Sequence, residues 1–137
     1  MNVPVEISIG EFFDKLTILE IKQRRIRDAA KLQNINRELS RLNHLLQGLP
    51  FSRRDVRDEL DQLKAINEEL WGIEEELRSR EKTKAFDDGF IELARAVYRN
   101  NDRRFEVKRA INLKLGSDFV EEKSYERSGA VSFKQRA

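Results

Sequence analysis

A row of polar and amphipathic residues lies where a long helix should bury only apolar ones. Residues 52–82 carry an apolar residue at every third or fourth position, and a second row runs beside that face. The second row, spaced four, three and four residues apart, consists of Asn67, Trp71, Glu74 and Arg78. Burying an unpaired amide costs about 1–3 kcal/mol, and a charge costs more. These side chains therefore need partners, either in a polar inter-helix network around a packed tryptophan or in a ligand.

A second group of charged residues lies in the segment GEFFDKLTILEIK. It comprises Glu11, Asp14, Lys15, Glu20 and Lys22. Glu11 and Lys15 are four residues apart and suit an ion pair on a solvated helix face. Glu20 differs, because it falls on the same arc of the helix as Phe13 and Leu16. Ile18 and Ile21 fall on the opposite arc, which predicts that this helix packs against partners on two sides.

The third group lies in residues 95–112, where basic side chains alternate with asparagines. It contains Arg95, Tyr98, Asn101, Asp102, Arg103, Arg104, Lys108 and Asn112. Arginine, lysine and asparagine side chains bind phosphate or carboxylate through hydrogen bonds that the cationic groups strengthen. The same residues would equally suit docking on residues 53–82, which are acidic overall. Both interpretations stay open at this point.

The sequence does not contain the residues that several kinds of catalytic or binding site require. The chain has no cysteine, so it has no disulfide and no thiolate nucleophile. Its glycines are isolated, which argues against a glycine-rich phosphate loop. The single histidine, His44, falls on the polar flank of a predicted helix. Asp55, Asp58 and Asp61 share a face near a helix start, where acidic residues complement the helix dipole. We therefore expect no metal site, and the sequence indicates no particular cofactor.

Four helices are predicted to position these groups. The first three cover about residues 8–27, 28–47 and 52–82, and the fourth follows a turn and cap at Asp87-Asp88-Gly89 and reaches Leu115. Ser8 and Glu11 form a capping-box pattern at the first start, and Gly116 is a stop signal at the last end. Asn100-Asn101-Asp102 is poor helix material and predicts a kink or break. The lengths predict an all-α antiparallel bundle of about four helices, two of them long, in a single domain at 1–125 with a disordered tail at 126–137.

Composition narrows the class of protein. The chain has 137 residues, of which 39% are hydrophobic and 38% charged, as suits long helices with one solvated face. A net charge of +2 makes nucleic acid an improbable partner. There is neither a signal-peptide pattern nor an apolar run long enough for membrane insertion, so we expect a cytoplasmic protein.

The unequal helix lengths predict an overhang that leaves apolar surface uncovered in a monomer. The residues expected to be exposed there are Val56, Leu60, Val107 and Ile111. Exposed apolar patches of this kind favour association, so we expect a homodimer or a higher homo-oligomer.

Four strings of the chain together resemble a known family. They are SIGEFFDKLTILEIK, INEELWGIEEELRSRE, FIELARAVYRNNDRRFEVKRAIN and GSDFVEEKSY. The patterns SIGExxDKxTILEIK, NDxRxxxKxxIN and EEKSY are similar to those of a small bacterial all-α domain family of unknown function, and the resemblance covers residues 6–125. It implies that the family motifs include Glu11, Asp14, Lys15, Glu20, Lys22, Asn67, Trp71, Glu74, Asn101, Asp102, Arg103, Lys108, Asn112, Glu121, Glu122, Lys123 and Tyr125. It implies no activity.

Polar motif residues carried on several helices favour a shared pocket over a fold signature. We therefore hypothesise a helical protein that binds a small anionic ligand, a nucleotide or sugar phosphate, between its helices. The candidate ligand-binding residues are Glu11, Asp14, Lys15, Lys22, Asn67, Trp71, Arg78, Tyr98, Asn101, Asp102, Arg103, Lys108 and Asn112.

Within this set the lysines and arginines would hold the anionic group, the aromatic rings would stack, and the asparagines would fix the orientation. A metal-independent enzyme acting on such a ligand is an alternative, with Glu20 or Glu74 as the acid–base group if the fold buries it. A structural coiled-coil adaptor is another alternative, in which the polar rows only select the helix partner.

Overall fold

The computed structural model describes residues 1–124, and the predicted disordered tail lies outside these described residues. Within them the chain is all-α, with no strand. The elements are α1 (Ile9–Arg25), α2 (Ala29–Gln47), a 3₁₀ turn η1 (Arg53–Val56), α3 (Arg57–Thr83) and α4 (Asp88–Leu115). The prediction of an antiparallel bundle of four helices is confirmed. None of the described helices is long and apolar enough to cross a membrane.

The helix ends follow the sequence signals closely. The hydroxyl of Ser8 accepts a hydrogen bond from the backbone N–H of Glu11 at 3.1 Å, and Asp28 caps α2 in the same way. Asp55 and Ser52 form a reciprocal capping box before α3. Gly116 ends α4 in the left-handed region at φ 71°, where a residue without a Cβ is favoured. Because Ile26 is extended, α1 ends two residues earlier than predicted.

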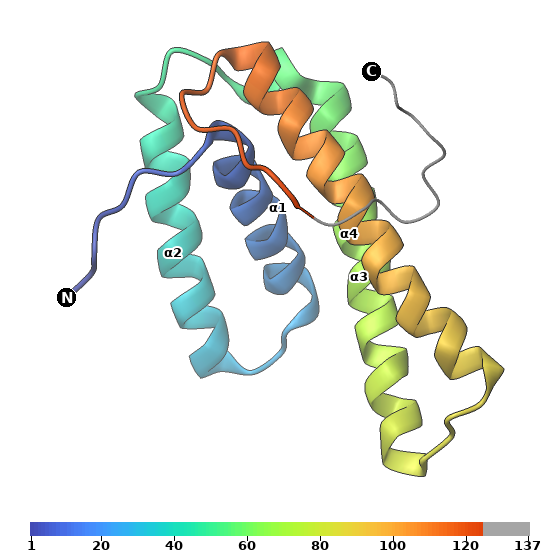
Figure 1. Ribbon diagram of the computed structural model, residues 1–137. Coiled ribbons are helices and arrows are strands. Elements are labelled where there is room, and N and C mark those ends of the chain that lie inside the picture. Colours follow the sequence, from blue (N-terminus) through green and yellow to red (C-terminus); the bar gives the residue numbers. More distant parts are fainter. Residues whose placement is uncertain (125–137) are drawn as a thin grey trace, which may run out of the picture.

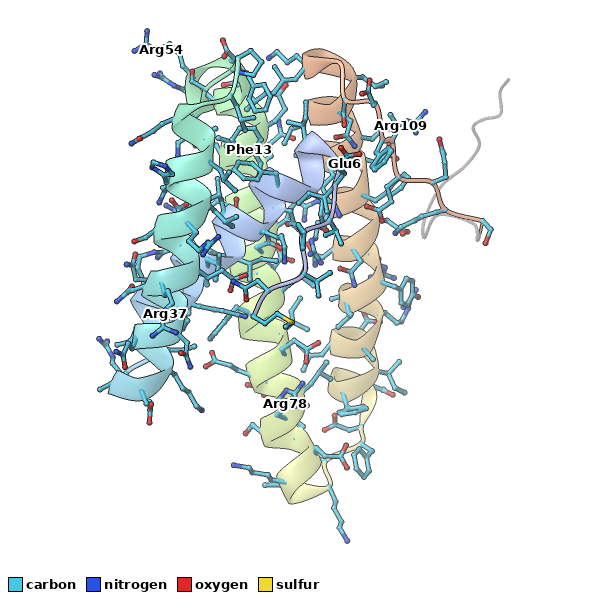
Figure 2. All side chains as sticks on the ribbon, turned by 90° about the vertical axis from the view of Figure 1, so that its left-hand side faces the viewer. Glu6, Phe13, Arg37, Arg54, Arg78 and Arg109 are labelled. Carbon is cyan, nitrogen blue, oxygen red and sulfur yellow. The ribbon has the colours of Figure 1, made fainter. Side chains whose placement is uncertain are left out.

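The first helix is the centre of the bundle. Figure 1 shows α1 between α2 and the long α3–α4 hairpin, and α1 contacts each of the other three helices. Phe13 and Leu16 of α1 meet Leu63 of α3 and Ile111 of α4 in one apolar core. Phe13 lies in the interior in Figure 2, whereas Arg54 points outward at the end of the bundle. This core therefore holds α1 in place against α3 and α4.

The prediction that the long helices overhang the short ones at Val56, Leu60, Val107 and Ile111 is wrong, because the overhang lies at the other end of the α3–α4 hairpin. Val56 and Ile111 are completely buried and Val107 is 8% exposed, because α1 covers this end of the hairpin. Leu60 is half-buried. The overhang lies at the opposite end, near the α3–α4 connection, where Phe86 is exposed. The apolar positions that motivated self-association are thus covered within one chain, and a homo-oligomer stays a prediction.

Asn100-Asn101-Asp102 does not interrupt α4. The Asn100 side chain is buried and donates hydrogen bonds to the Ala96 carbonyl at 2.9 Å and to Glu69 Oε2 at 3.0 Å. Arg103 Nη1 donates to Asn100 Oδ1 at 2.8 Å. These partners within the helix and across to α3 satisfy the polar group that would otherwise compete with the helical backbone.

Candidate functional site

A side cleft of about 560 Å³ lies between α1, α3 and α4. Its lining comprises Ile18, Ile21 and Lys22 of α1, Asn67, Leu70, Trp71, Glu74, Glu75 and Arg78 of α3, and Val97, Asn101 and Arg104 of α4. All four members of the polar row on the third predicted helix line the cleft. Because α3 is continuous through these residues, their spacing of three and four residues puts them on one face of the helix.

Apolar side chains form much of the cleft. Ile18 and Ile21 come from α1, Leu70 from α3 and Val97 from α4. The two isoleucines are the ones that fall on the second apolar arc of the first predicted helix. Phe13 and Leu16 on one side of α1 lie in the apolar core, whereas Ile18 and Ile21 line the cleft beside α3 and α4. This arrangement explains why α1 is apolar on two sides.

Three cations line the cleft, and two of them have carboxylate partners. Arg78 pairs with Glu74 at 3.3 Å near the free end of the hairpin, where Figure 2 places it. Arg104 donates from Nε to both oxygens of Asp14 at 3.1 Å. Lys22 is half-buried and has no ion-pair partner among residues 1–124. Lys22 is therefore the cation that the fold leaves available to an anion.

Trp71 presents its indole ring on the α3 wall. The guanidinium of Arg25, which is not a lining residue of the cleft, lies 5.9 Å from the ring centroid. Arg25 is itself held by Glu68 at 2.9 Å, and this hydrogen bond, together with that from Arg24, lowers the pKa of the Glu68 carboxyl below its ordinary value. The indole Nε1 is buried and finds no acceptor in the described part of the chain. A buried donor without an acceptor costs about 1–3 kcal/mol.

Asp14 lies behind the cleft and positions two of its lining residues. It is only 1% exposed and accepts a hydrogen bond from the Asn67 amide at 2.9 Å as well as those from Arg104. Burial by itself would lower the pKa of the Arg104 guanidinium, but the hydrogen bonds and charge of Asp14 outweigh it and raise that pKa above its ordinary value. Asp14, Asn67 and Arg104 thus form a polar cluster that joins α1, α3 and α4.

Lys108 lies outside the cleft. Its ammonium group contacts Glu121 at 2.9 Å, Glu11 at 3.4 Å and Asp14 at 4.0 Å, and its side chain is 9% exposed. Glu121 belongs to the segment 117–124, which runs back beside α4 (Figure 1). Two more ion pairs hold this segment to α4, between Glu122 and Arg109 and between Lys123 and Asp102. The carboxylates that Lys108 meets therefore come from α1 and from this segment, and not from α3.

Lys108→Met is expected to lower the free energy of unfolding by about 1–3 kcal/mol, because it leaves nearby carboxylates without their cation. Urea unfolding followed by circular dichroism measures this change. Lys114→Met is the matched control on the same helix, since Lys114 is half exposed and its pair with Glu59 lies at the surface, where pairs contribute about 0–1 kcal/mol. If the Lys108→Met protein were as stable as its parent, its ion pairs would not stabilise the fold, and Lys108 of the parent would be available to bind a ligand.

The remaining candidates lie apart from the cleft, and for them ligand binding stays a prediction. Lys15 and Tyr98 are exposed, and Arg103 is exposed beside Glu69. Glu20 pairs with Arg53 at 2.8 Å in a separate groove. Asn112 is buried and accepts the Gly10 backbone N–H at 2.6 Å, so it joins α4 to the start of α1.

From the sequence, Arg104 is placed in the third group of basic residues but left out of the candidate ligand-binding residues, and Glu75 and the apolar lining are overlooked. Arg104 carries a recognisable signal, because Val97, Asn101 and Arg104 follow one another at four and three residues and therefore share a helix face. Glu75 has no such signal, since it adjoins Glu74 and Glu76 in an acidic run.

The fold and the cleft together define a helical protein with a partly apolar side cleft, in which Lys22 has no ion-pair partner among residues 1–124. The chain belongs to DUF6165, a family of unknown function, which matches residues 3–133. This confirms that the chain is a member of a family without an assigned function, whereas the motif strings and the bacterial origin stay predictions. No curated protein and no solved structure matches the chain.

Proposed function

We propose that this protein binds a small anionic molecule in the cleft between α1, α3 and α4. The observation that carries the proposal is Lys22, a half-buried cation without an ion-pair partner among the described residues, which shares the cleft with Trp71. The cleft volume of about 560 Å³ falls within the usual range of about 300–1,000 Å³ for small-molecule sites. Nucleotides and sugar phosphates belong to this size class and carry the required charge.

Each wall would contribute a different part of the recognition. Lys22 on α1 would bind the anionic group, and the ring of Trp71 on α3 would pack against the body of the ligand. Asn101 on α4 would help to set the orientation, with Arg104 fixed beside it by Asp14. We expect the protein to act in the cytoplasm, where such metabolites are found.

The geometry supports binding more than catalysis. The enzyme alternative required a buried carboxylate, but the Glu74 side chain is 48% exposed and Glu20 lies outside the cleft. The adaptor alternative required that the polar rows pair entirely within the bundle. Lys22 and the Trp71 N–H do not, within the part of the chain that the structure describes.

Lys22→Met tests the proposal, because the substitution keeps the apolar stem and removes the charge. We expect ligand affinity to fall by about 10–100-fold, which corresponds to the loss of one charge-assisted hydrogen bond. Trp71 is the only tryptophan of the chain, so its fluorescence reports on the cleft alone. Nucleotides and sugar phosphates would first be screened for those that raise the melting temperature of the protein. The affinity of these compounds would then be measured from the change in Trp71 fluorescence.

Lys31→Met is the matched control, because Lys31 is an exposed lysine of α2, a helix that does not line the cleft. It should bind as the parent protein does. Equal affinity of the Lys22→Met and parent proteins would contradict the proposal, as would a set of nucleotides and sugar phosphates of which none changes the Trp71 fluorescence.

A further inference from the structure

Of the three cations that line the cleft, Lys22 alone lacks an ion-pair partner among residues 1–124. Arg104 is neutralised by Asp14, and Arg78 shares its charge with Glu74. Glu75 also lines the cleft and has no ion-pair partner in the described residues. The cleft therefore contains one cation and one carboxylate without ion-pair partners among the described residues. A ligand carrying two negative charges would place the second one near Glu74 and Glu75, where like charges repel.

Part of the cleft wall offers no free hydrogen-bonding group to a polar body. Ile18, Leu70 and Val97 present only hydrocarbon, and Trp71 presents an aromatic ring. The Asn67 amide is already bound to Asp14, and Asn101 Oδ1 accepts a hydrogen bond from Arg104 at 3.4 Å. Hydroxyl groups of a ligand that lay against these apolar side chains would be buried without partners, which opposes binding.

We infer that the ligand is an aromatic monoanion, with one carboxylate, sulfonate or phosphodiester group at Lys22 and a planar ring against Trp71. The inference rests on the proposed function and narrows it, since it disfavours sugar phosphates and the doubly charged phosphate of a mononucleotide. Planar rings stack on indole at little conformational cost, and one charge matches Lys22, the cleft cation without an ion-pair partner among residues 1–124.

Matched probes test this inference through the Trp71 fluorescence. Cyclic AMP and AMP share a base and a ribose, but AMP carries nearly two charges at neutral pH. We expect cyclic AMP to bind at least about tenfold more tightly than AMP, and glucose 6-phosphate to bind more weakly than either. 8-Anilinonaphthalene-1-sulfonate, an aromatic monoanion, should bind more tightly than the uncharged N-phenyl-1-naphthylamine, and Lys22→Met should abolish that difference.

Glu75→Gln sharpens the test, because it removes the uncompensated carboxylate without changing the size of the side chain. It should raise the affinity for AMP more than that for cyclic AMP. Glu76→Gln is the control, since Glu76 pairs with Arg80 and does not line the cleft.

The two levels of the proposal fail in different ways. If AMP or glucose 6-phosphate bound more tightly than cyclic AMP and the sulfonate, and Lys22→Met abolished that binding, the monoanion inference would be overturned while the proposed function stood. If no probe changed the Trp71 fluorescence, or if charged and uncharged probes bound equally to the parent protein, the anion site itself would be refuted.

Discussion

Asp14→Ala should lower the free energy of unfolding by about 3–5 kcal/mol, the cost of removing one partner from a buried ion pair. The expected effect is large because Asp14 is 1% exposed and serves three helices at once. It bonds Arg104 and Asn67 and lies 4.0 Å from Lys108. Its loss would leave Arg104 partly buried without a carboxylate. Urea unfolding monitored by circular dichroism gives the change directly.

Two further variants make this result specific. Asp118→Ala removes an exposed carboxylate and should change the stability by less than about 0.5 kcal/mol. Adding Arg104→Met to Asp14→Ala should cost less than the sum of the two single changes, because the unpaired cation is then absent. Additive effects of the two changes would show that Asp14 and Arg104 do not stabilise each other.

Gly10→Ala should lower the free energy of unfolding by about 1–3 kcal/mol, because α1 and α4 touch at this position. An added Cβ would lie 2.4 Å from the Lys108 carbonyl oxygen and 3.0 Å from Asn112 Oδ1. The first neighbour is backbone and cannot turn aside. The helices would have to separate, which would also break the 2.6 Å hydrogen bond from the Gly10 N–H to Asn112.

Gly72→Ala is a control that should change the free energy of unfolding in the opposite direction. Gly72 lies within α3, and nothing lies within 4 Å of the added Cβ. Alanine is favoured over glycine in a helix interior by about 1 kcal/mol, so this variant should be more stable than its parent. Thermal unfolding of the two alanine variants side by side measures both effects. Stabilisation by Gly10→Ala would mean that α1 and α4 do not approach as closely as described.

The fold could be predicted from the sequence because its signals are local. Ser8, Asp28 and Gly116 mark helix ends through contacts with residues three or four positions away, and the structure follows them. The side of the hairpin that α1 covers depends on contacts between residues far apart in the chain. Val56 and Ile111 were therefore assigned to the surface although they are core residues.

The candidate site could be predicted only in part, for the same reason. The polar row of α3 and Lys22 of α1 lie along the cleft, because helical spacing alone puts each set on one face. Lys108 shares the charge of Lys22 but differs in its neighbours, which include Glu11 and Glu121 from distant parts of the chain. Charge type and spacing do not reveal whether a cation already has a partner inside the protein.

The end of the α3–α4 hairpin that extends beyond α1 has a consequence for how the molecule opens. Of residues 74–99, all of which the structure describes, none is buried. Segments with few buried contacts unfold locally at a lower free energy than the whole domain, and their backbone amides exchange with solvent first. The cleft joins this end to the core, since Lys22 lies on α1 whereas Arg78 and Val97 lie on the extension. A molecule held in the cleft would therefore slow hydrogen exchange at the hairpin tip, beyond the residues that it contacts.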